Sequence, residues 1–148
     1  MMEIAIVKMS EEHIASLAHI ERECFSTPWS DKALADELKN SHGRFFVALC
    51  NGKVAGYIGA HNIVGEVYIT NVAVSGAFRR QGVATALIKE LVKISKDENA
   101  DFITLEVRES NTSARALYKK QGFEEVGTRK AFYESPRENA VLMTVNLK

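Results

Sequence analysis

The chain has 148 residues, of which 46% are hydrophobic and 26% are charged, with 19 basic and 19 acidic side chains. This length suits one domain spanning residues 1–148, at about 100–200 residues per domain, and the apolar content is enough for one core. The balanced charge argues against bulk binding to nucleic acid or to a membrane surface. The acidic N-terminus lacks a long apolar run, so we expect no signal peptide or membrane span and a cytoplasmic protein.

Hairpin and cap signals dominate the first half of the chain. The patterns predict a strand over residues 3–8, helices beginning at Ser10 and Ser30, and strands over 45–50, 54–62 and 67–74. Pro28 cannot continue the first helix, and the second carries Leu34 and Leu38 on one apolar side. Asn51-Gly52 is typical of a tight hairpin turn. Consecutive hairpins therefore predict an antiparallel meander before residue 75.

The second half alternates helices with strands. Its patterns predict a helix over 80–96, a strand over 102–107, a helix over 111–121, and strands over 123–128 and 140–147 around a polar loop. Gly122 suits a left-handed helix end. A meander followed by a β-α-β crossover predicts an α/β fold, with a mixed and mostly antiparallel central sheet flanked by helices.

The loop between the strand over 67–74 and the next helix has the features of an anion site. Helix N-termini expose unpaired N–H groups with partial positive charge. Gly82 and Ala84 allow close approach to that backbone, and Arg79 and Arg80 add full charges. Together they suit a diphosphate. The P-loop and Rossmann glycine spacings are both absent. A plain helix N-terminus with incidental arginines is the alternative.

The segment Arg79-Arg-Gln-Gly-Val-Ala84 fits the pattern [QR]-x-x-G-x-[GA] of the GNAT superfamily of N-acetyltransferases, which the order of elements also resembles. Three further segments, 25–30, 105–123 and 129–133, resemble the RimI family of bacterial ribosomal-protein-alanine N-acetyltransferases. Ala84 stands where that family often has glycine. The resemblance implies that acetyl-CoA binds and that no metal is needed. It places the cofactor against the strand residues Val72, Ala73 and Val74 and the loop residues Arg79, Arg80, Gln81, Gly82, Val83, Ala84 and Thr85.

Forming an amide from a thioester and an amine requires a base for the amine and an acid for the departing thiolate. Glu106 points to the strand face opposite Ile103, where a carboxylate needs a partner or a role, and a solvated or salt-bridged carboxylate near the strand end is the alternative. Tyr118 lies on an apolar helix face, so core packing is its simpler interpretation. Resemblance to RimI makes Glu106 the general base and Tyr118 the general acid. Asn111 suits the cap of the Tyr118 helix, and the resemblance adds a cofactor contact.

The sequence gives the least information about the amine that accepts the acetyl group. Trp29 and Tyr133 are candidates for holding a peptide backbone, with ordinary loop packing as the alternative. A protein α-amine, with a pKa of about 7.7–8.0, is far more often neutral at pH 7 than a lysine, with a pKa of about 10.4. Resemblance to RimI implies the N-terminal alanine of a small-subunit ribosomal protein. A small-molecule amine, a lysine side chain and a non-catalytic acyl-CoA-binding module stay as alternatives, and the oligomeric state is open.

Overall fold

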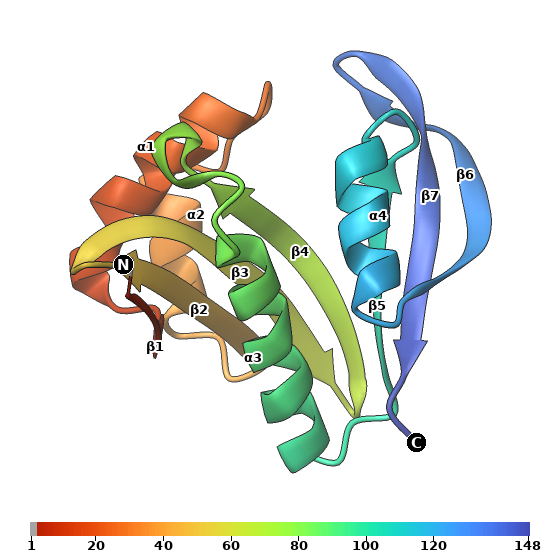
Figure 1. Ribbon diagram of the computed structural model, residues 1–148, viewed down its shortest axis with the longest axis horizontal. Coiled ribbons are helices and arrows are strands. Elements are labelled where there is room, and N and C mark those ends of the chain that lie inside the picture. Colours follow the sequence, from red (N-terminus) through yellow and green to blue (C-terminus); the bar gives the residue numbers. More distant parts are fainter. Residues whose placement is uncertain (1–2) are drawn as a thin grey trace.

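The computed structural model describes residues 3–148, which form one seven-stranded sheet in the order β1-β2-β3-β4-β5-β7-β6 (Figure 1). The strands are β1 (Ile4–Lys8), β2 (Gly43–Cys50), β3 (Lys53–Ile63), β4 (Glu66–Val74), β5 (Phe102–Arg108), β6 (Glu124–Glu134) and β7 (Arg137–Asn146). Only β4 and β5 pair in parallel, while the five other neighbouring pairs are antiparallel. The mixed, mostly antiparallel sheet expected from the sequence is therefore confirmed.

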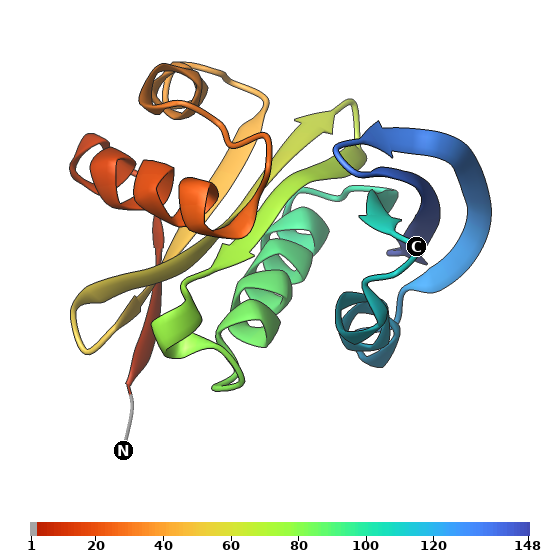
Figure 2. The same cartoon turned by 90° about the horizontal axis from the view of Figure 1, so that it is seen from above.

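Helices cover both faces of the sheet (Figure 2). They are α1 (Ile14–Cys24), α2 (Asp31–Glu37), α3 (Val83–Asp97) and α4 (Thr112–Lys120), with short 3₁₀ turns η1 (Glu11–His13) and η2 (Gly76–Phe78). Leu17 and Leu34 bury α1 and α2 against one face, and Leu87 and Leu91 bury α3 against the other. Within residues 3–148, no helix has the length and apolar character needed to cross a membrane.

The two halves of the sheet separate between β4 and β5. Their parallel pairing is confined to Glu66–Tyr68 against Phe102–Thr104, after which the two strands no longer pair with each other. Figure 1 shows the two strands meeting at one end and diverging toward the other. Each strand beyond the paired segment therefore presents an open edge to the space between them.

A β-bulge at Thr70 shapes the open part of β4. Gly59 pairs with Asn71 and Ala60 pairs with Ile69, so Thr70 is an extra residue on β4. One extra residue reverses the alternation of side chains between faces. Ile69 and Val72 consequently both lie on the α3 side of the sheet, while Asn71 turns toward α1.

Three details of the sequence-based expectation are wrong. α3 begins at Val83 rather than at residue 80, because Arg80 and Gly82 take left-handed conformations, with φ of 62° and 84°, that a helix does not allow. Leu38 lies beyond the end of α2 and is 39% exposed. The expected polar loop between the last two strands is itself paired strand, because β6 and β7 extend as one hairpin to a short turn.

Candidate active site

Glu106 lies at the base of the opening between β4 and β5. It is on the face of β5 opposite Ile103, Leu105 and Val107, as the alternation predicts, and its side chain is only 5% exposed. Its Oε2 accepts a hydrogen bond of 2.8 Å from the hydroxyl of Tyr68 on β4. Its Oε1 lies 3.8 Å from Nε of Arg129 on β6. The carboxylate is thus held between two strands that are distant in sequence.

Tyr118 lies on α4 and is 6% exposed. Its ring packs edge-on against Phe123 at a centroid distance of 5.5 Å. Burial is the main cause that raises the pKa of Tyr118 above its ordinary value of about 10, and the nearby Tyr133 adds to the effect. The phenol therefore keeps its proton more firmly than the unperturbed value used in the sequence argument implies.

The open edge of β4 offers main-chain groups to a ligand. The amide of Ser75 donates to the carbonyl of Ala55. This bond fixes which residues of β4 direct their main-chain N–H and C=O groups toward β3, since every second residue of an antiparallel strand does so. In that alternation Val72 and Val74 direct their main-chain groups away from β3, whereas those of Ala73 face β3. Of the three predicted strand residues, Val72 and Val74 are therefore the ones with main-chain groups on the open side.

The start of α3 carries three amides without a helical acceptor. The amide of Ala86 is the first to bond within the helix, to the carbonyl of Gly82, so those of Val83, Ala84 and Thr85 are unpaired in the α-helical pattern. Gly82 caps the helix without a side chain, and the position of its absent Cβ has no atom within 4 Å. Free amides at a helix start suit an anion such as a diphosphate.

Arg79 already has partners near this loop. Its Nε donates to the carbonyl of Val74 at 3.2 Å, and its Nη2 lies 3.4 Å from Sγ of Cys24. Arg80 is exposed, and Gln81 donates to the carbonyl of Ala77 at 3.4 Å. Both arginines predicted to face the diphosphate are exposed, and Arg79 braces the loop against the end of β4.

Asn111 caps α4, as its sequence position predicts. Its Oδ1 accepts from the amide of Ala114 at 3.2 Å and lies 3.4 Å from the hydroxyl of Ser113. Both contacts use the oxygen end of the amide group. The cap therefore leaves the Nδ2 end available for a second role.

Trp29 and Tyr133 each pack on their own neighbours. Trp29 is partly buried and lies against the core residue Phe45, with ring centroids 6.1 Å apart. Tyr133 lies under the guanidinium of Arg108, which is 4.3 Å from its ring centroid. Burial, followed by the charge of nearby Glu106, raises the pKa of the Tyr133 phenol.

Two loops meet on the side of the opening that Glu106 faces. The hydroxyl of Ser26, after α1, donates to the carbonyl of Ser135 at the tip of the β6–β7 hairpin at 2.6 Å. Arg108 holds the same tip, donating to the carbonyls of Ser135 at 3.1 Å and Pro136 at 2.9 Å. Arg108 also pairs with Glu138 at 3.2 Å, and hydrogen bonding from Ser110, followed by this pair, lowers the pKa of Glu138. The hairpin tip is thus fixed to β5, next to Glu106.

A buried carboxylate that the sequence analysis did not single out links α1 to β4. Glu21 is 1% exposed and accepts hydrogen bonds from the hydroxyl of Tyr57 at 2.6 Å and the amide of Trp29 at 2.8 Å. Nδ2 of Asn71 lies 3.4 Å from the same carboxylate, while Oδ1 of Asn71 and the hydroxyl of Thr70 are buried without a partner in the described residues. Unpaired buried polar atoms are rare, and here both lie at the bulge of β4.

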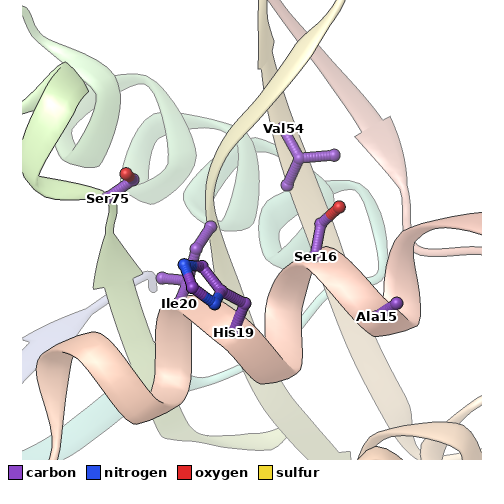
Figure 3. Close-up of a pocket in the computed structure, with 6 residues that line it drawn as sticks. All are labelled: Ala15, Ser16, His19, Ile20, Val54 and Ser75. Carbon is purple, nitrogen blue, oxygen red and sulfur yellow. The ribbon is translucent and has the colours of Figure 1, made fainter.

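One hollow on the surface involves none of the residues described so far as site candidates. It has a volume of about 360 Å³ and is lined by residues of α1, β3 and the end of β4, namely Ala15, Ser16, His19, Ile20, Val54 and Ser75 (Figure 3). None of the predicted site residues lines it. Among residues 3–148, no three His, Cys, Asp or Glu side chains are grouped to hold a metal ion.

Known proteins share this architecture. Residues 14–123 match the model of the acetyltransferase (GNAT) family. The [ribosomal protein bS18]-alanine N-acetyltransferase of Escherichia coli K12 is 33% identical over 129 residues, 86% of each chain, and that of Haemophilus influenzae is 35% identical over 88% of this chain and 90% of its own. The crystal structure of the ribosomal-protein-S18-alanine N-acetyltransferase from Escherichia coli superimposes with a TM-score of 0.91 at 29% identity, covering 99% of this chain and 95% of that one. The chain therefore belongs to the GNAT family and is an acetyl-CoA-dependent N-acetyltransferase.

Proposed function

We propose that the chain acetylates the N-terminal α-amine of a protein, with the N-terminal alanine of a small-subunit ribosomal protein as its acceptor. Relatives at 33% and 35% identity carry the name of that activity on bS18. The observation that carries the chemistry is the carboxylate of Glu106, 5% exposed and at the base of the opening between β4 and β5. A protein α-amine has a pKa of about 7.7–8.0, so roughly one in ten is already neutral at pH 7, and Glu106 need only accept the proton released as the amine attacks.

In this proposal acetyl-CoA supplies the activated acetyl group as a thioester. The main-chain groups of Val72 and the amide of Val74, whose carbonyl already accepts from Arg79, hold its extended arm along the open edge of β4. The amides at the start of α3 hold its diphosphate. Nδ2 of Asn111 is the free donor on the α4 side. Most of the rate gain comes from holding amine and thioester in the reacting geometry.

Two side chains handle the protons. Oε1 of Glu106 takes the proton of the attacking amine, directly or through a water molecule, because Oε2 is already bonded to Tyr68. The hydroxyl of Tyr118 gives a proton to the departing sulfur. Since burial raises the pKa of Tyr118, this transfer is uphill before the reaction starts, so proton movement must accompany cleavage of the C–S bond. The amide of Val74 is our candidate donor to the thioester oxygen.

The proposal is tested by incubating wild type and Glu106→Gln with acetyl-CoA and a panel of acceptors, read by mass spectrometry. The panel holds peptides that differ in their first residue, lysine-containing peptides with blocked N-termini, polyamines and aminoglycosides. We expect alanine-started peptides to react fastest, and Glu106→Gln to lower their turnover about 100-fold or more while acetyl-CoA affinity stays near wild type.

The choice of acceptor and the role of Glu106 would be contradicted by different results. A preference for polyamines or aminoglycosides would overturn the peptide assignment, and a preference for the blocked peptides would make lysine the acceptor. Full turnover by Glu106→Gln would remove Glu106 from the base role without affecting the choice of acceptor.

A further inference from the structure

Tyr68 occupies the last position at which β4 and β5 are still paired. It lies opposite Thr104 in the parallel register, and Glu106 is two residues further along β5 on the same face. Beyond this point the strands separate and no backbone hydrogen bond joins them. The hydroxyl of Tyr68 spans the widening gap and donates to Oε2 of Glu106 at 2.8 Å. This side-chain hydrogen bond therefore connects β4 and β5 just beyond the last residues that pair through their backbones.

The hydrogen bond engages one oxygen of the carboxylate and not the other. Oε1 has Arg129 as its charged neighbour, at 3.8 Å, a distance too long for a direct hydrogen bond. Burial and the bond to Glu106 raise the pKa of Tyr68, so its hydroxyl stays a donor throughout the physiological range. A fixed donor on Oε2 therefore sets the orientation of the carboxylate and leaves Oε1 free of a direct bond.

We propose that Tyr68 is a positioning residue for acetyl transfer, which orients Glu106 so that Oε1 is the oxygen that removes the proton of the acceptor amine. This inference rests on the proposed role of Glu106 as general base. In this role Tyr68 acts through its hydrogen bond to Glu106. It was not among the residues that the sequence indicated, since its partner is 38 positions away.

The test is Tyr68→Phe, which removes the hydroxyl and keeps the ring. Tyr68 is 36% exposed, so the fold tolerates the change. We expect kcat with an alanine-started peptide to fall about three- to tenfold, the size of effect expected for one hydrogen bond to a charged group, with the Kd of acetyl-CoA unchanged. Glu66→Gln, an exposed change two positions earlier on β4, is the matched control and should keep wild-type turnover.

The pH profile separates positioning from a purely structural role. Arg129 and Tyr133 on β6 face Glu106 from the other side, and both remain in the variant. A hydrogen bond donated to a carboxylate favours its ionised form. Removing the Tyr68 hydroxyl should therefore move the acidic limb of the kcat/KM profile to higher pH, and Glu66→Gln should leave the limb in place.

A double-mutant cycle completes the test. If Tyr68 acts through Glu106, adding Tyr68→Phe to Glu106→Gln lowers turnover no further. Unchanged kcat and pH profile in Tyr68→Phe, or an equal loss in both backgrounds, would overturn the positioning role while leaving Glu106 as the base. Full activity of Glu106→Gln alone would instead overturn the base assignment and this inference together.

Discussion

The two sides of the opening between β4 and β5 are built from different parts of the chain. The β4 side presents main-chain groups: the open edge at Val72 and Val74, and the amides that begin α3 after the left-handed Gly82. The β5 side presents side chains, with Glu106 bonded to Tyr68 and Arg108 bonded to the hairpin tip.

This difference predicts how each side responds to substitution. A site made of amides is insensitive to most side-chain changes but depends on backbone conformation at a few positions. A site made of side chains depends on single functional groups, because each one carries a distinct hydrogen bond or proton. Substitutions on the β5 side and on α4 should therefore change turnover, and substitutions at the start of α3 should change acetyl-CoA affinity.

The largest effect after Glu106 is expected for Tyr118→Phe. The change removes the hydroxyl and keeps the ring that packs against Phe123. We expect kcat to fall about 100-fold, the lower end of the range for a proton-transfer group, with the Kd of acetyl-CoA unchanged. Because the pKa of Tyr118 is raised above about 10, wild-type activity should not decline through this group on the alkaline side up to that pH.

Steady-state kinetics between pH 6 and pH 10, together with thermal unfolding, check this prediction. Wild-type kcat in the variant would make Tyr118 a packing residue only. A fall in kcat that is matched by a large fall in Tm would point to the same conclusion.

The opposite pattern is expected for Gly82→Ala on the β4 side. A Cβ at this position meets no atom within 4 Å, so the only penalty is the left-handed φ of 84°. That conformation costs a residue with a side chain about 1–2 kcal/mol, so the free loop relaxes and acetyl-CoA must restore it. We expect the Kd of acetyl-CoA to rise about tenfold, measured by isothermal titration calorimetry, with kcat at saturation near wild type.

Gly127→Ala is the matched control, since its Cβ position is equally open and its φ is not left-handed. Its acetyl-CoA affinity should equal that of wild type. An unchanged Kd in Gly82→Ala would show that the start of α3 does not bind the diphosphate through this backbone conformation. The contrast between main-chain binding on the β4 side and side-chain chemistry on the β5 side would then be weaker.

Features that depend on adjacent residues could be predicted from the sequence. Asn51-Gly52 forms its tight turn with φ of 49° and 83°, Asn111 caps α4, and Gly122 takes a left-handed conformation with φ of 96°. The start of α3 was misplaced because Gly82 caps the helix without a Ser, Thr, Asp or Asn side chain to mark it. The face of Glu106 followed from simple alternation along a regular strand.

Features that depend on strand register could not be predicted. The partner of Glu106 is set by the parallel pairing of β4 with β5, which the sequence of either strand alone does not specify. The bulge at Thr70 is equally hidden, since an extra residue changes which face Asn71 occupies without changing the apolar pattern before it. The buried Glu21 has a similar origin, because its three donors come from three different segments.

The smallest effect is expected for Arg108→Lys, which tests whether the β5 side also selects the acceptor. Lysine keeps the charge but has one side-chain nitrogen, so it cannot reproduce the fork in which Nη2 reaches Ser135 while Nη1 reaches Pro136 and Glu138. It also loses the planar stacking on Tyr133. The hairpin tip should become less ordered, raising the KM for an alanine-started peptide about threefold while the KM for acetyl-CoA stays constant. Arg137→Lys, an exposed change on the same hairpin, should leave both KM values at wild type. An equal rise in the two KM values of Arg108→Lys would mean that the hairpin supports the whole opening. In that case the cofactor would not depend on main-chain groups alone, and the acceptor would not depend on the β5 side chains alone.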